Sequence, residues 1–151
     1  MANTTKIPER LPIKRMPDLY TKHIGRYKNG HGLFFGMTTE LCIDVDGNPL
    51  RDRIGHSRFY AVLFLFGDDG TFHECRSLMS SHSLEESYGN LCHLLRDIGT
   101  VEYCDIAVNL FSTWIDGVEF GLVADSESGV VNLHPNSLIT FSEPWDGEYF
   151  T

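Results

Sequence analysis

The residues best suited to metal chemistry are His73 and Cys75, which stand two positions apart in the segment TFHECRSLM. Side chains at positions i and i+2 of a strand point to the same side, so an imidazole and a thiolate there could share one zinc ion. Two ligands are too few to hold a zinc ion. Cys92 and His93 could add to them only if their helix lay over this strand, and neighbouring helical side chains project about 100° apart. We therefore expect no bound metal and no other cofactor, with His73 and Cys75 as the candidate ligands.

The sequence identifies no catalytic residue. A nucleophilic serine needs a base within hydrogen-bond reach and an orienting acid, whereas the Ser80, Ser81 and His82 cluster reads as the polar turn before a helix cap. A carboxylate pair needs a cleft that raises one pKa above the other, and no G-x-G-x-x-G or Walker-type phosphate loop is present. Whether the protein is an enzyme stays open, and we lean towards a non-enzymatic one.

Strands dominate the elements that would position these residues. Asn29-Gly30 between two aromatic-rich segments favours a hairpin with a type I′ turn. The run RFYAVLFLF at 58–66 is almost continuously apolar, as in a central strand covered on both faces. GDDG at 67–70 predicts the turn of a second hairpin, and residues 44–57 read as a long polar loop.

One segment predicts a helix. Ser83 and Glu86 form a capping box, and Gly99 suits the C-terminal cap. Leu84, Leu91, Leu94 and Leu95 are expected to form its buried stripe.

The segments after the helix return to strand patterns. In VEYCDIAVNLFSTWI, alternation places Ile106, Val108, Leu110 and Trp114 on one face, and a further set follows in GVEFGLVAD. The aromatic residues are expected to form most of the core: Tyr27, Phe34, Phe35, Phe59, Tyr60, Phe64, Phe66, Phe72, Phe111, Trp114 and Phe120.

The pattern predicts an α+β fold. We expect a twisted, mostly antiparallel sheet of about seven to eight strands, with one main helix over about residues 84–98 packed on one face. Residues 1–19, with Pro8, Pro12 and Pro17, are expected to form an extended basic arm, and residues 20–151 a single domain. Cys42, Cys75, Cys92 and Cys104 lack the close pairing of a zinc ribbon, so we expect buried free thiols.

Charge is divided unevenly along the chain. The first 28 residues carry seven basic and two acidic side chains, a net charge of +5, whereas residues 97–151 carry ten acids and no Lys or Arg. An acidic surface repels phosphate backbones, so we expect no nucleic-acid partner. A basic protein partner fits better, as does the basic arm of the same or a neighbouring subunit. The arm therefore offers a route to a homo-oligomer.

Location can be predicted from the absence of two signals. No apolar run approaches the ~20 residues of a membrane span, and the first twenty residues lack the apolar region of a signal peptide. We expect a cytoplasmic protein without a membrane partner.

Four segments together resemble a known group. IGRYKNGHGLFFG, RFYAVLFLFGDDG, YCDIAVNLFSTWIDGVEFGLV and LHPNSLITFSEPWDGEYFT are similar to small bacterial proteins often labelled formate hydrogenlyase regulatory protein-like. Similar members carry a DGxxFGLV-type segment, here Asp116 to Val123, and a PWDGxYxT ending, here Pro144 to Thr151. The likeness covers roughly residues 22 to 151. It implies a standalone bacterial domain with a regulatory label, and it supplies no catalytic residues.

The acidic C-terminal segment is the candidate interaction site. Trp145 and Tyr149 either tie this segment to the sheet or anchor a partner, since Trp and Tyr are frequent at binding hot spots. Glu143, Asp146 and Glu148 extend the acidic third of the chain. We therefore expect a cytoplasmic regulatory or protein-binding domain; an immunity protein that neutralises a basic toxin would use the same charge complementarity. The alternative is a small-molecule binder or an unrecognised enzyme with a pocket between helix and sheet, lined by His73, Arg76 or His93.

Overall fold

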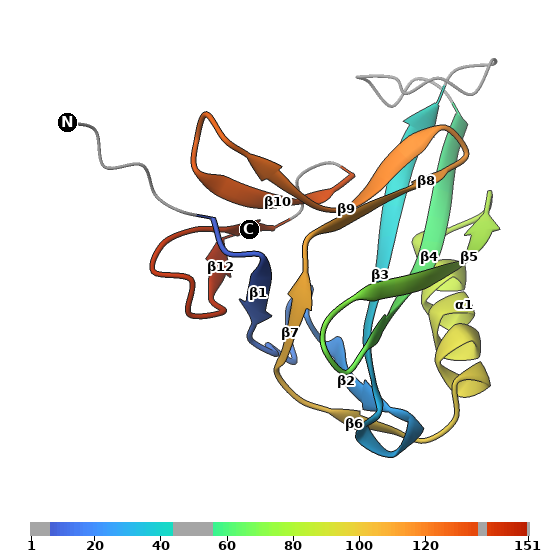
Figure 1. The fold of residues 1–151 in the computed structure, drawn as a ribbon. Helices are drawn as coiled ribbons and strands as arrows, with labels where there is room; N and C mark the ends of the chain where they lie inside the picture. Colours follow the sequence, from blue (N-terminus) through green and yellow to red (C-terminus); the bar gives the residue numbers. More distant parts are fainter. Residues whose placement is uncertain (1–6, 44–55, 136–138, 151) are drawn as a thin grey trace.

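The computed structural model describes residues 7–43, 56–135 and 139–150, which form one α-helix, a short 3-10 turn and twelve strands (Figure 1). The elements in chain order are β1 (Arg10–Ile13), β2 (His23–Tyr27), η1 (Lys28–Gly30), β3 (Gly32–Ile43), β4 (His56–Gly67), β5 (Phe72–Ser80), α1 (Leu84–Asp97), β6 (Val101–Tyr103), β7 (Ile106–Asn109), β8 (Phe111–Ile115), β9 (Val118–Asp125), β10 (Val130–His134), β11 (Thr140–Phe141) and β12 (Tyr149–Phe150).

These strands form three antiparallel sheets. The N-terminal sheet has the order β5-β4-β3-β2-β6, the C-terminal sheet has the order β12-β11-β10-β9-β8, and β1 pairs with β7 in a two-stranded ribbon. The α+β class, the antiparallel pairing and the single main helix are confirmed. The expectation of one sheet with seven to eight strands is wrong, because the strands divide among three sheets.

The division into three sheets originates in residues 101–115, which alternation predicts as one strand. The segment is instead interrupted twice, and its pieces join different partners: β6 pairs with β2, β7 with β1, and β8 with β9. At the first interruption, Asp105 leaves the ladder and its carboxylate accepts the backbone N–H of Arg15 at 2.7 Å. At the second, the N–H of Leu110 donates to the carbonyl of Glu9 at 3.3 Å. Contacts with the arm therefore redirect the chain.

Both predicted hairpins of the N-terminal sheet are present. β2 and β3 pair from Tyr27↔Gly32 outwards, but their connection is longer than the two-residue type I′ turn expected at Asn29-Gly30. Lys28, Asn29 and Gly30 have φ values of 54°, 57° and 90°, so left-handed backbone begins one residue earlier. The second hairpin turns at Gly67–Gly70, as predicted. Most of the long loop expected over 44–57 lies outside the described residues.

Strand β4 is buried on both faces, as its apolar run predicts. Every residue from Ala61 to Phe66 is buried, and β4 lies between β3 and β5. Ala61, Leu63 and Leu65 pack towards α1, whereas the alternate side chains enter the larger core on the opposite face. Each fully buried Val, Leu or Phe side chain of β4 contributes about 1.5–3 kcal/mol to stability relative to an exposed one.

The helix begins where the capping signal predicts. The hydroxyl of Ser83 accepts the backbone N–H of Glu86 at 3.1 Å, and Gly99 follows the helix with φ 86°. The predicted stripe is wrong at Leu84, which is 39% exposed; Ser87, one turn further on, is buried instead. Its hydroxyl donates to the carbonyl of Leu84 at 2.6 Å, which satisfies a buried polar group within the helix.

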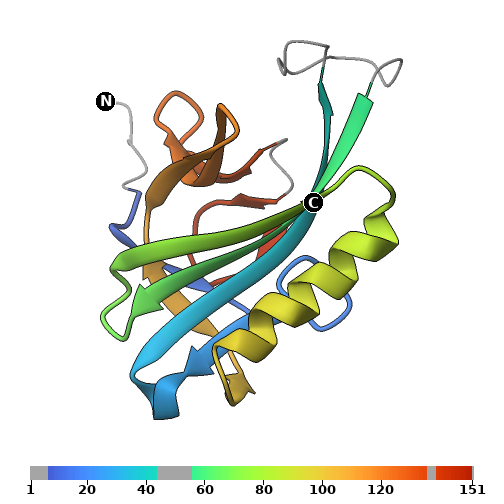
Figure 2. The same cartoon turned by 90° about the vertical axis from the view of Figure 1, so that its right-hand side faces the viewer.

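The molecule has three layers (Figures 1 and 2). Helix α1 covers one face of the N-terminal sheet, and the C-terminal sheet with the β1–β7 ribbon covers the other. The larger core between the sheets contains Phe35, Phe64, Phe66 and Phe120, all with at most 1% exposure. In the described parts of the chain, no helix combines the length and apolar character that a membrane span requires.

The arm predicted over residues 1–19 is extended only in part where it is described. Arg10–Ile13 form β1, and both Leu11 and Ile13 are buried in the larger core. The residues after β1 turn back on themselves, with the N–H of Leu19 donating to the carbonyl of Met16 at 3.0 Å. The arm thus contributes strand, core and turn to the same unit as the rest of the chain.

Candidate protein-interaction surface

Trp114 lies on the surface, contrary to the expectation that it belongs to the core. It is 67% exposed, whereas Ile106 and Val108 of the same predicted face are buried. The break at Leu110 shifts the alternation by one residue. Before it, even-numbered side chains such as Val108 enter the core; after it, the odd-numbered Phe111 does so. Three residues later, Trp114 points away from the core. Phe59 and Phe72 are only partly buried, so the aromatic core is smaller than predicted.

A tight turn holds Trp114 in this orientation. β8 and β9 are joined by Asp116 and Gly117, which have φ values of 51° and 80°, as a two-residue type I′ turn requires. Trp114 is then directly opposite Glu119, and the two side chains share one face of the sheet. The sequence contains a signal for this exposure. A two-residue turn at Asp116-Gly117 places Trp114 opposite Glu119, and Glu119 must face outward because the adjacent Phe120 faces the core.

The turn is tied to the N-terminal sheet by a buried tyrosine. The hydroxyl of Tyr60 in β4 donates to Oδ2 of Asp116 at 2.7 Å, and its ring packs against Phe120. Burial, and next the hydrogen bond to Asp116, raise the pKa of Tyr60. The phenol therefore stays protonated at neutral pH and keeps its proton for this bond, which fixes the support behind Trp114.

A second exposed aromatic lies at the opposite edge of the C-terminal sheet. Phe150 in β12 is 70% exposed, while the preceding Tyr149 pairs with Phe141 and packs towards the core. The sequence did not single out Phe150, because a two-residue strand is too short for alternation to indicate its outward face. The two exposed rings therefore mark the two edge strands of one sheet.

The C-terminal sheet has a single sign of charge. The chain contains no Lys or Arg after Arg96, so Asp and Glu supply all the charged side chains of β8 to β12 and their connections, histidine aside. Asp116, Glu127 and Glu148 are exposed, and Glu119 and Asp125 are half-buried. Acidic side chains spread over a sheet whose own strands contain no Lys or Arg favour a negative potential around Trp114 and Phe150.

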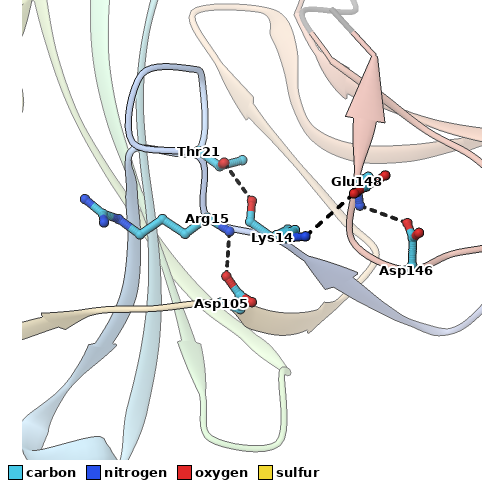
Figure 3. Close-up of polar contacts among 6 residues, drawn as sticks. All are labelled: Lys14, Arg15, Thr21, Asp105, Asp146 and Glu148. Carbon is cyan, nitrogen blue, oxygen red and sulfur yellow. Dashed lines mark hydrogen bonds and ion pairs between the residues drawn. The ribbon is translucent and has the colours of Figure 1, made fainter.

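The predicted tail residues meet the basic arm of the same chain (Figure 3). Nζ of Lys14 lies 3.6 Å from Oε1 of Glu148, and the N–H of Lys14 donates to the carbonyl of Gly147 at 2.9 Å. Oδ1 of Asp146 accepts the N–H of Glu148 at 3.1 Å, which shapes the turn. Charge complementarity between the two ends of the sequence is thus used within one chain.

Thr21 and Tyr149 form the buried centre of this contact. The Thr21 hydroxyl donates to the carbonyl of Lys14 at 2.8 Å and accepts the N–H of Met16 at 2.9 Å. Because the Thr21 hydroxyl proton is donated to Lys14, the Tyr149 hydroxyl must be the donor to Thr21 Oγ1, at 2.8 Å. The Tyr149 oxygen also accepts the Thr21 N–H at 3.3 Å. Thr21 is fully buried. We call the contact formed by Lys14, Thr21, Gly147, Glu148 and Tyr149 the terminal clasp.

Trp145 lies beside the terminal clasp with its ring against the larger core. Its φ is 62°, in the left-handed region that a bulky residue rarely adopts. Its Nε1 is buried without a hydrogen-bond partner among the residues that the structure describes. Glu143 and Asp146 are exposed on either side of it. The expected role of these tail residues in binding a partner stays a prediction.

A bulge separates the candidate metal ligands His73 and Cys75. Phe66 is opposite Phe72 and Leu65 is opposite Glu74, so β5 has one extra residue at His73. Phe72 and Cys75 both pack on the larger core, whereas His73 is exposed. Within the described residues, no group of three or more His, Cys, Asp and Glu is placed to hold a metal ion.

The thiols differ in their surroundings. Cys75 and Cys104 are partly buried, and Cys92 is exposed on α1, so the expectation of a buried thiol is wrong for Cys92. Burial, and next the Glu74 carboxylate, raise the pKa of Cys75 to about 11. Such a thiol is a poor nucleophile at neutral pH.

The space between helix and sheet is filled by apolar side chains. Leu91, Leu94 and Leu95 of α1 pack against Phe34 and Leu63 of the sheet, all at most 7% exposed. The polar residues suggested for a pocket here do not converge: His73 and His93 are exposed, and Arg76 forms an ion pair with Glu74 at 3.2 Å. The cluster of Ser80, Ser81 and His82 forms a turn, as expected, in which Ser80 Oγ accepts the N–H of His82 at 3.1 Å.

No family model, curated protein or solved structure matches the chain. The resemblance to formate hydrogenlyase regulatory protein-like proteins, and the regulatory role that it implies, therefore stay predictions.

Proposed function

We propose that this protein is a non-enzymatic protein-binding domain whose C-terminal sheet docks a basic polypeptide partner. The observation that carries the proposal is Trp114, a tryptophan exposed at the edge of a sheet that contains no Lys or Arg. Regulatory or immunity-type action would both be exerted through such a contact.

Exposed aromatics supply the anchoring part of this proposal. Burying a large aromatic side chain against a partner removes apolar area from water at about 25 cal/mol per Å², and Trp is enriched among residues that dominate binding energy. Trp114 and Phe150 present this area at opposite edges of the sheet. Glu119, directly opposite Trp114, places a carboxylate beside the anchor.

Charge supplies partner choice. The arm contacts the acidic third through the ion pair of Lys14 with Glu148 and through the backbone N–H of Arg15, which donates to Asp105 without adding a charge. The negative potential around β8 and β9 attracts basic partners, speeds their association and repels acidic ones. This attraction weakens as salt shortens the Debye length from about 10 Å at 0.1 M.

Selection from a displayed random peptide library at 50 and 300 mM NaCl tests the proposal. We expect enriched peptides with a net positive charge, whose affinity falls at the higher salt concentration. Replacing both Trp114 and Phe150 by Ala should weaken their binding at least tenfold. Tyr88→Ala is the matched control, because Tyr88 is 52% exposed and belongs to α1, the helix that covers the face of the N-terminal sheet opposite the C-terminal sheet (Figure 2). Enrichment of peptides without positive charge, or equal losses in the control, would refute the proposal.

A further inference from the structure

β8 is an edge strand of the acidic C-terminal sheet. It is the last strand of the C-terminal sheet, and its five residues pair with β9 in continuous register from Phe111↔Leu122 to Ile115↔Val118. On an edge strand, about half of the backbone N–H and C=O groups point away from the sheet. Among the described residues, β8 has no strand partner other than β9.

The other edges of the two large sheets carry features that discourage strand addition. β5 has a bulge at His73 and the charged pair Glu74 and Arg76, and charges and bulges are common protections of exposed edges. β6 has three residues and β12 has two, which are short for pairing. β5, β6 and β12 are thus each protected against strand addition, whereas β8 lacks these protections.

The sequence of β8, Phe-Ser-Thr-Trp-Ile, has no such protection. It contains no charged residue and no proline, and Thr, Trp, Phe and Ile all favour strands. Ser112 and Trp114 are exposed on the outward face. An added strand would therefore meet the outward backbone groups of β8, which have no strand partner among the described residues, and the exposed Trp114 side chain beside them.

Charge selects the occupant of this edge. Asp116 follows the strand and Glu119 is opposite Trp114, and no Lys or Arg lies within the sheet. A second copy of this chain would bring the same acidic surface and a net charge of −9, so like charges oppose β8 pairing with itself. An extended segment with Lys or Arg at alternate positions would instead place its charges on one face, above the carboxylates.

We propose that β8 binds an extended basic segment of a partner protein by strand addition, with Trp114 as the side-chain anchor. This inference rests on the proposed function and specifies its geometry: the partner's backbone pairs with the β8 edge, as in other complexes formed by β-augmentation.

Three decapeptide pools test the inference. In the first, Lys alternates with randomised uncharged residues; the second has the same charge but proline at two central positions; the third has Glu in place of Lys. Affinity is measured by fluorescence polarisation, and deuterium exchange is followed in the segment that covers residues 111–115. We expect the first pool to bind at least tenfold more tightly than the second and to slow exchange in that segment.

Two substitutions locate the site. Trp114→Lys and Ser112→Lys both add a positive charge on the exposed face of β8, and each should weaken binding of the first pool at least tenfold. Tyr88→Lys adds the same charge at an exposed aromatic on α1 and should leave the affinity within twofold. Unchanged melting temperatures would show that the variants remain folded.

The outcomes separate the two proposals. Equal binding of the alternating and proline pools, or binding without slowed exchange in residues 111–115, would overturn strand addition while leaving a basic partner intact. Equal or tighter binding of the Glu pool, or no binding by any pool, would overturn both proposals. Protection of β8 in the free protein together with dimers in sedimentation would assign this edge to a second copy of the chain and refute the inference.

Discussion

The hydroxyls of Thr21 and Tyr149 lie 2.8 Å apart, although the residues are separated by 128 positions in the sequence. This contact fastens the C-terminal segment to the turn between β1 and β2, while Phe150, the residue after Tyr149, remains exposed. The terminal clasp thus determines which aromatic residues of the tail stabilise the fold and which is available at the surface.

Tyr149→Phe should lower the free energy of unfolding by about 1 kcal/mol, because it removes the hydroxyl that serves the buried Thr21. Urea denaturation measures the difference. Tyr88→Phe removes an exposed hydroxyl and should change stability by less than about 0.5 kcal/mol. Equal effects of the two substitutions would show that the clasp contributes no stability.

Gly147→Ala should destabilise the protein by about 1–2 kcal/mol. Gly147 has φ 94°, and a Cβ there would lie 3.0 Å from the backbone nitrogen of Lys14, which is tighter than an ordinary contact. Gly89→Ala is the opposite control, since it lies inside α1 with open space around it and should gain about 0.5–1 kcal/mol. Chemical denaturation of both variants checks the signs; a neutral Gly147→Ala would contradict the close packing of the clasp.

Stability should fall in mild acid because of His23. Burial, and next the charges of Lys22 and Arg15, lower the pKa of His23 below its ordinary value of 6.5. Between that value and the lowered folded pKa, the unfolded chain binds the proton more readily, so the free energy of unfolding decreases as pH decreases. His23→Gln should flatten this part of the stability profile, measured by urea titrations between about pH 5 and 7. An unchanged slope in the variant would contradict the assignment.

Cys92 should react with thiol reagents far faster than Cys75. Cys92 is exposed, whereas the pKa of Cys75 is raised to about 11, so little Cys75 thiolate exists at pH 8. We expect labelling of Cys75 to be slower by on the order of a hundredfold. Time-resolved alkylation with peptide mass spectrometry measures both sites, and comparable rates would show that Cys75 is accessible.

Local signals in the sequence were sufficient for the elements that depend on local chemistry. The helix cap at Ser83, the turn at Gly67–Gly70 and the buried run of β4 follow from residue type and spacing. Each of these features is determined by neighbours within a few residues, so the printed sequence contains the necessary information.

The sheet division could not be predicted because it depends on distant contacts. The strand pattern of residues 101–115 is nearly continuous, and its breaks coincide with hydrogen bonds to Arg15 and Glu9, about 90 or more positions away. The exposure of Trp114 follows from the second break, although the local turn at Asp116-Gly117, with Phe120 facing the core, also indicates it. The candidate site was therefore only partly foreseen: the acidic third was visible in the sequence, but its principal exposed aromatic was assigned to the core.

The central claim is that the C-terminal sheet is the binding surface, and a chemical-shift map of the backbone amides tests it most directly. A basic peptide selected from the displayed library would be titrated into the ¹⁵N-labelled protein at 50 mM NaCl, with the Trp114 indole signal followed alongside. The account predicts that the largest shifts cluster in β8, β9 and β12 and include that indole. Shifts confined to α1 and β5, with the Trp114 indole unmoved, would contradict it.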